Sequence, residues 1–391
     1  MYLDNINSLI KYRTNVFFSI IILFLILGIS ARYTHGAHNI QKILALIIPI
    51  CMVIKFGLES GYIKHFIIYL TTVFLCYIFS DQNYVDISPL TFLRAVLGFG
   101  ILYVIMLVKN GTYLRSLTTG LVLLPLFMVL ISSTCHFLFN ISVTSGGNRY
   151  GAGISSAHFA FLTYFVILFL AYESLLKKRI YLFFIAVTLI MMLLSGSRGP
   201  LLAALLPIAL LLPFLKLRDI QRKIILTSPL IIIVGSKLIL SMVERSKMTT
   251  FDSDGGLNLS GREYAWSYFL EKIEGLNLFG GKLGSITKVT EGVKEYNLYV
   301  FTVPHNEFIR FYMELGIIGC SLFFLNIILI MSKTYRISSS TTRKFLVTSF
   351  IGMFILTLFD NSLSTLQSSV PFALLLKYIH FNEKLRHEEK I

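Results

Sequence analysis

The stretch VPHNEFIRFYMELGIIG, residues 303–319, places a histidine, an amide, two carboxylates and an arginine at the start of a long apolar run. Polar groups at or inside a lipid bilayer are costly, so they usually mark a binding site or a path. The surrounding chain determines on which face of a membrane this stretch lies, and therefore which chemistry it can meet.

The whole chain has the composition of an integral membrane protein. Of its 391 residues, 55% are hydrophobic and only 14% are charged, whereas a soluble domain carries about a quarter charged residues. Apolar runs of about 17–25 residues, long enough to cross a bilayer as helices, recur from end to end. We therefore expect an all-α, polytopic membrane protein with one membrane domain over residues 1–391. An outer-membrane β-barrel would show short alternating segments instead.

About twelve spans account for these runs. We interpret the first as retained, because its run is too long for a typical signal peptide and no clear cleavage site follows it. The expected spans are 15–31, 40–57, 65–80, 89–108, 116–139, 154–173, 180–194, 200–215, 224–242, 307–332, 345–360 and 366–380.

The basic residues are divided unequally between the two sides of these spans. The termini and the short loops on their side hold twenty Lys and Arg, and the short loops on the other side hold four. The positive-inside rule therefore places both termini in the cytoplasm. The net charge of +15 reflects this topology and does not call for a nucleic-acid partner. The long loop at residues 243–306 then lies outside.

The long outer loop contains a short amphipathic helix. Ser260 and Glu263 have the spacing of a capping box, and four apolar residues then share one face: Trp266, Phe269, Leu270 and Ile273. We expect this helix to lie along the outer membrane surface or over the mouth of a cavity.

The sequence indicates no metal, cofactor or disulfide. Asp252 and Asp254 lie two apart, but a glycine-flanked acidic pair is more often a turn. The outer loops show no other carboxylate pattern suited to a divalent metal. All four cysteines lie within apolar runs without metal-ligand spacing, and they are Cys51, Cys76, Cys135 and Cys320.

The turn SGSRGP, residues 195–200, joins two spans on the outer side. Gly196 can end one helix in a left-handed cap, and Pro200 can open the next helix. Arg198 would then lie at the positive end of a helix dipole, an arrangement typical of phosphate sites. A turn whose arginine reaches lipid headgroups is an equally good interpretation.

Three more arginines lie on the outer side. Arg262, in the first turn of the loop helix, could simply stack on Trp266. Arg149, in a glycine-rich loop, could be a solvated residue. Arg94 lies about one turn inside the fourth span, where a charge favours a cavity over lipid.

The stretch 303–319 also contains three charged residues and two glycines. Glu307, Arg310 and Glu314 are three and four residues apart, so they share a helix flank and can pair. A salt-bridge network is the simpler interpretation of this trio, although Arg310 and Glu314 could also line a cavity. Gly316 and Gly319 are spaced for close helix packing.

His305 lies at the outer mouth of the tenth span, and we expect Asn306 beside it to take part in catalysis by orienting the histidine or the acceptor. A neutral imidazole can accept a proton from a sugar hydroxyl near neutral pH. Arginines can hold a diphosphate bidentately and stabilise it as it leaves. The pattern therefore predicts metal-independent glycosyl transfer from a lipid diphosphate to a sugar hydroxyl.

Three stretches, in order, resemble the O-antigen ligase/polymerase superfamily of bacterial surface-polysaccharide assembly. Residues 195–200 are similar to its Ser/Thr-x-Ser/Thr-Arg turn, and residues 261–285 resemble its Arg-x-x-x-Trp helix with a Gly-rich turn. Residues 304–319 are similar to its His-Asn pair followed by Glu-x-Gly-x-x-Gly. The resemblance covers about residues 195–320 and rests on the ordered set of three.

The resemblance implies a bacterial inner-membrane enzyme of about twelve helices, whose site faces the periplasm and binds undecaprenyl-diphosphate-linked oligosaccharide. His305 matches the catalytic histidine, and Arg198 and Arg262 match the diphosphate-binding arginines. Family members work without metal and usually invert the anomeric centre. The segment FGGKLGS has extra spacing relative to a tight Gly-x-Gly turn, so the position of that turn stays open.

Two activities compete within the superfamily. A polymerase joins lipid-linked repeat units, and a ligase moves the finished glycan to lipid A-core. We favour the polymerase, because the histidine motif and the compact outer loop look more like polymerases. Its expected partners are the lipid-linked substrates, membrane lipids and a chain-length regulator. A flippase is the alternative from another class, but such transporters usually show repeated halves, and none is visible here.

Overall fold

The computed structural model describes residues 2–29, 37–81, 86–109, 111–145, 149–177, 181–209, 262–273, 278–289 and 303–389. The regular secondary structure in this part of the chain is helical, except for one antiparallel hairpin of β1 (Thr144–Ser145) and β2 (Arg149–Tyr150). The helices are α1 (Tyr2–Leu23), continued by a π-helical turn (Phe24–Gly28), α2 (Ala37–Phe56), α3 (Ile63–Phe79) after a 3-10 turn (Ser60–Tyr62), α4 (Pro89–Leu107), α5 (Gly111–Phe139), α6 (Ser156–Lys177), α7 (Leu182–Ser195), α8 (Arg198–Ala209), α10 (Arg262–Ile273), α11 (Ile286–Val289), α12 (Glu307–Ile337), α13 (Ser340–Phe359) and α14 (Leu366–Glu388).

The helices confirm an all-α, polytopic membrane protein. Eleven of the twelve expected spans overlap a helix, and the remaining one, 224–242, lies outside the described residues. Within the described ranges, six helices are long and apolar enough to cross a membrane, namely Ser60–Phe79, Pro89–Leu107, Tyr113–Phe139, Ser156–Lys177, Glu307–Ile337 and Ser340–Phe359.

The centre of the bundle is α6. Its side chains are buried on every face, as expected for a helix that is apolar all round, and the large ones include Phe159, Tyr164, Phe165 and Tyr172. It contacts α5, α7, α8, α13 and α14. The two ends of α6 therefore define the two ends of the molecule.

α14 is a buried helix that carries many polar residues. Gln367 Nε2 donates to Leu27 O at 2.8 Å, and Lys377 Nζ donates to Met106 O at 2.9 Å. These groups are satisfied by neighbouring helices rather than by lipid, since a buried polar group costs free energy unless it is hydrogen-bonded. Contacts inside the protein thus explain why α14 is less apolar than its neighbours.

α12 is broken near its start by the Gly-rich loop 278–285. Gly316 has φ +65° and ψ −176°, which is not helical. The loop fills the break, because Gly281 N donates to Met313 O at 2.9 Å and Ile318 N donates to Leu278 O at 3.3 Å. The extra spacing in FGGKLGS leaves the position of the Gly-rich turn open, and the structure places this turn against the break in α12.

The two glycines of the Glu-x-Gly-x-x-Gly pattern have different neighbours. The expectation that Gly316 packs against a helix is wrong: a Cβ added there would lie 2.6 Å from the backbone nitrogen of Gly280, in the docked loop. Gly319 does face a helix, since an added Cβ would lie 2.5 Å from Cys76 Sγ on α3. The close contact between α3 and α12 therefore depends on Gly319.

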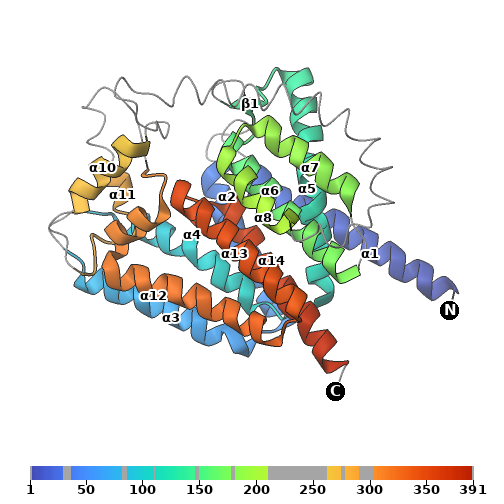
Figure 1. Ribbon diagram of the computed structural model, residues 1–391. Helices are drawn as coiled ribbons and strands as arrows, with labels where there is room; N and C mark the ends of the chain where they lie inside the picture. The colour runs from blue at the N-terminus through green and yellow to red at the C-terminus, as the bar shows by residue number, and fades with distance from the viewer. Residues whose placement is uncertain are drawn as a thin grey trace.

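The loop helix and the termini lie at different ends of the molecule. Figure 1 shows α10 and α11 beside the start of α12, at the upper left, and both chain ends at the lower right. α10 packs on α12 through a small apolar cluster of Ala265, Phe269, Ile273, Ile286 and Met313. Leu270, expected on the apolar face, is exposed instead.

Candidate functional site

His305 forms a hydrogen-bonded pair with an aspartate that follows α13. His305 Nδ1 lies 3.1 Å from Asp360 Oδ1. The side chains are 41% and 21% exposed, respectively, so the pair is open to an approaching substrate. Because the carboxylate engages Nδ1, the other ring nitrogen, Nε2, is left to exchange a proton with that substrate. This arrangement is the one a general base requires.

The carboxyl group of Asp360 is ionised by its neighbours. Burial acts to raise its pKa, but the hydrogen bond and charge of His305 and the charge of Arg262 act to lower it, and the net pKa lies below the ordinary value. Asn361 N also donates to Asp360 Oδ1 at 2.9 Å. Asp360 can therefore orient the imidazole and stabilise it once it is protonated.

The backbone of His305 is in an unusual conformation. Its φ of +50° lies in the left-handed region, which costs free energy for a residue other than glycine and persists where the surroundings enforce it. Trp266 supplies part of that constraint: its Nε1 donates to Pro304 O at 2.8 Å, and its ring lies 6.4 Å from that of Phe359. The α10 helix thus holds the residues that precede His305 and Asp360.

Asn306 is the N-cap of α12. Its Oδ1 accepts hydrogen bonds from Phe308 N at 2.9 Å and Ile309 N at 3.1 Å, and the residue is buried. Capping of this kind satisfies backbone donors that the first turn leaves unpaired. Asn306 therefore fixes where the helix starts, directly after His305, and a role in catalysis stays a prediction.

Arg262 is the first residue of α10, and its charge acts on Asp360. The indole of Trp266 contacts Pro304 and Phe359, and its stacking with Arg262 stays a prediction. The structure therefore brings this predicted diphosphate ligand to the His305–Asp360 pair.

Arg198 lies at the same end of the molecule. It is exposed and begins α8 two residues after Gly196, whose φ of +66° confirms the left-handed cap that ends α7. α8 runs antiparallel along α13: an added Cβ on Gly199 would meet Leu356, and one on Gly352 would lie 3.0 Å from the carbonyl oxygen of Ala203. Arg198 is therefore level with the end of α13 that leads into Asp360.

Arg310 and Glu314, two members of the charged trio on α12, form a network with the Gly-rich loop. Arg310 Nε lies 3.4 Å from Glu314 Oε2, which confirms their pairing, and its Cζ lies 5.2 Å from the Phe99 ring. Glu314 is fully buried, and the backbone amides of Gly284 and Ile286 lie against its carboxylate. The network therefore ties the Gly-rich loop to α12.

The other cavity candidates are on the surface. Arg94 is exposed on α4, and Arg149 is exposed on β2. Their participation in a cavity stays a prediction.

Two residues of this region were missed by sequence reasoning. Asp360 lies 55 residues from His305 and carries no local motif, although an acid at the outer end of an apolar span is a signal in itself. His158, in the first turn of α6, interacts electrostatically with Asp360. It was hidden inside an apolar run.

The fold and this site define a class: a multi-helix membrane protein with a histidine–carboxylate pair and arginines at one end of its helices. A comparison with protein families gives the class a name. The family model described as O-antigen ligase matches residues 182–324, a stretch that contains all three motifs. The match supports membership of the O-antigen ligase/polymerase superfamily and confirms the resemblance. Members of this family are glycosyltransferase-like enzymes of O-antigen synthesis. No curated protein sequence gives a significant match to the chain.

Proposed function

We propose that this protein polymerises a surface polysaccharide, transferring the growing glycan from undecaprenyl diphosphate to a lipid-linked repeat unit on the periplasmic side of the inner membrane. The His305–Asp360 hydrogen bond carries this proposal, because it supplies an oriented base on an exposed rim. Arg262 beside the pair, and Arg198 at the same end, supply the positive charge that a diphosphate leaving group needs.

In the proposed reaction His305 acts on the acceptor sugar. Nε2 takes the proton of the acceptor hydroxyl, and the hydroxyl oxygen attacks the anomeric carbon of the donor glycan. The bond from that carbon to the diphosphate oxygen breaks, and undecaprenyl diphosphate leaves with the electron pair. Attack opposite the leaving group inverts the anomeric centre. Asp360 stabilises the imidazolium until the proton is released to solvent.

Arg198 and Arg262 have complementary roles in this scheme. Each guanidinium offers a planar fork of donors that matches phosphate oxygens, and each lies at the first residue of a helix, where the dipole also favours an anion. The negative charge on the diphosphate grows as the glycosyl bond breaks, so these contacts strengthen in the transition state and accelerate transfer.

A ligase that moves the glycan to lipid A-core is the second candidate, because the matched family model bears that description. The two activities share the donor and the base, and they differ in the acceptor. We favour the polymerase because the histidine motif and the compact outer loop look more like those of polymerases.

The test is His305→Ala in cells that make the polysaccharide, with His387→Ala as control, since His387 is an exposed histidine in the last turn of α14. We expect the first variant to lose long-chain product while its membrane level is unchanged, and the control to keep it. Loss of a polymerase leaves single repeat units on lipid A-core, whereas loss of a ligase leaves long chains on undecaprenyl diphosphate. Normal chain lengths in His305→Ala would disprove the base assignment.

A further inference from the structure

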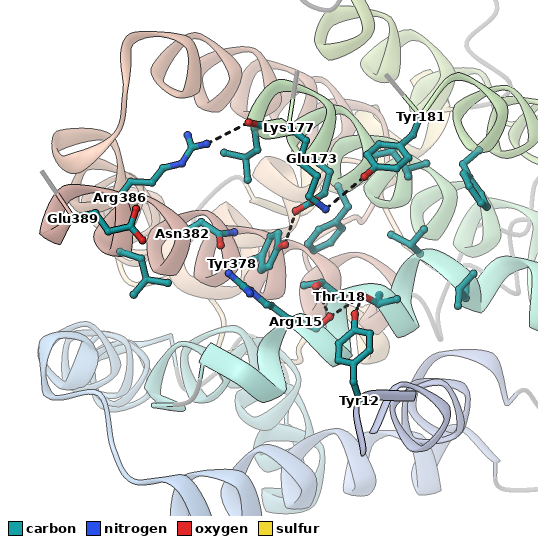
Figure 2. Close-up of a pocket in the computed structure, with 18 residues that line it drawn as sticks. Tyr12, Arg115, Thr118, Glu173, Lys177, Tyr181, Tyr378, Asn382, Arg386 and Glu389 are labelled. Atoms are coloured by element: carbon teal, nitrogen blue, oxygen red, sulfur yellow. Dashed lines mark hydrogen bonds and ion pairs between the residues drawn. The ribbon is translucent and has the colours of Figure 1, made fainter. Parts of the chain in front are cut away.

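A groove of about 680 Å³ lies where α6 and α14 end (Figure 2). Its walls come from α1, α5, α6, α7 and α14. Lys177 lines the groove at the last residue of α6, and His158 lies in the first turn of the same helix. A helix of this length spans about 30 Å, so the groove is a separate site.

The lining of the groove changes from polar to apolar along two helices. On α5 it passes from Arg115 in the first turns to Leu123 two turns further into the bundle. On α6 it passes from Lys177 at the helix end to Phe169 two turns before it. A ligand that fits must therefore be charged at one end and apolar at the other. The volume is typical of small-molecule sites.

Most charges at the rim are already paired within the protein. Lys177 Nζ lies 2.5 Å from Glu173 Oε2, and Glu173 also accepts a hydrogen bond from the Tyr378 hydroxyl. Arg386 Nη1 lies 3.5 Å from Oε1 of the buried Glu383. These pairs build the walls of the groove and leave little charge for a ligand.

Arg115 is the exception at this rim. Its side chain is exposed, and it forms no ion pair with the residues that the structure describes. Figure 2 shows it directed toward Tyr378 and Asn382, inside the groove. Glu389 adds one carboxylate at the rim. The groove thus offers an unpaired guanidinium and the Asn382 amide above an apolar floor.

We propose that this groove binds a glycerophospholipid, with the phosphate on Arg115 and an acyl chain over Leu123 and Phe169. A guanidinium makes charge-assisted hydrogen bonds to phosphate oxygens, and basic pockets between membrane helices are suited to phospholipid headgroups. The Tyr12 hydroxyl lies 2.9 Å from Thr119 Oγ1, which joins α1 to α5 at the rim. A lipid in this groove would brace α1 against α5 and α14.

The experiment uses the full chain, purified in detergent and stripped of lipid. Binding of radiolabelled dioleoylphosphatidylglycerol is measured for the wild type and for Arg115→Ala. We expect saturable binding by the wild type and an affinity about tenfold lower in the variant, as the loss of a charge-assisted contact implies. Unlabelled dioleoylglycerol, which has the same chains without a phosphate, is expected to compete poorly.

Two further variants make the result specific. Arg336→Ala removes an exposed arginine in the last turn of α12, outside the groove, and is expected to bind lipid as the wild type does. Leu123→Trp fills the apolar floor and is expected to lower binding without a change of charge. The proposal is overturned if Arg115→Ala and Arg336→Ala bind alike, if Leu123→Trp binds normally, or if dioleoylglycerol competes as well as the phospholipid.

Discussion

The change Gly316→Ala tests whether the break in α12 holds the Gly-rich loop 278–285 in place. The φ and ψ of Gly316 are open essentially only to glycine, and another residue there costs about 1–3 kcal/mol. The added Cβ would lie 2.5 Å from the carbonyl carbon of Leu278 and 2.6 Å from Gly280 N. Backbone atoms cannot rotate away, so overpacking adds about 1–3 kcal/mol. The total, about 2–6 kcal/mol, is a large share of an ordinary folding free energy of about 5–15 kcal/mol.

We expect this cost to detach the loop rather than unfold the bundle, since the added Cβ meets the backbone of the loop directly. The assay is limited trypsin digestion, in which cleavage after Lys282 reports a detached loop, together with glycan transfer activity. Gly98→Ala on α4 is the control, because an added Cβ there meets nothing within 4 Å and a helical glycine gains up to about 1 kcal/mol on that change. Equal cleavage and equal activity in the two variants would refute this reasoning.

The remaining predictions concern the charged residues of the site. Asp360→Asn is expected to lower the transfer rate by about 10²–10⁴-fold. It is also expected to move the acid limb of the pH–rate profile to lower pH, because the imidazolium loses its neighbouring carboxylate. An unchanged profile would contradict the His305–Asp360 pairing. The lowered pKa of Asp360 means that its contribution to stability is present above about pH 4, the ordinary carboxyl value, and is lost only as the pH falls through the lower value in the fold. A plot of apparent Tm against pH for the wild type and Asp360→Asn checks this. Alanine at Arg198 or Arg262 is expected to abolish activity, and lysine to restore only part of it, because an ammonium lacks the bidentate fork; full rescue by lysine would argue against diphosphate binding.

The helices could be predicted from the sequence because the lipid bilayer restricts which sequences can cross it. A span must be long and apolar, so runs such as 89–108 and 154–173 indicate the helices directly. The first turns of α8 and α10 were also predictable, since turn and helix-start patterns act locally, although the capping residue Ser260 lies outside the described residues. These signals are properties of a few consecutive residues.

The pairing inside the site could not be predicted in the same way. His305 and Asp360 meet only because α12 and α13 pack side by side, and spacing along the chain carries no such information. The break at Gly316 was equally hidden, because a glycine between apolar residues fits a packed helix as well as a kink. The cap that Asn306 forms on α12 was hidden in the same way, because its neighbour His305 suggests a catalytic role first.

The break at Gly316 also divides α12 into two pieces with separate supports. The outer piece, Glu307–Leu315, is bound to α10 and to the docked loop, whereas the inner piece runs beside α3 through the apolar part of the bundle. Membrane helices tilt to match the thickness of the bilayer around them. A tilt of the inner piece can be taken up at the paired glycines, Gly280 and Gly316, before it reaches the imidazole. The position of His305 is then set by α10 and the docked loop and is insulated from the lipid composition.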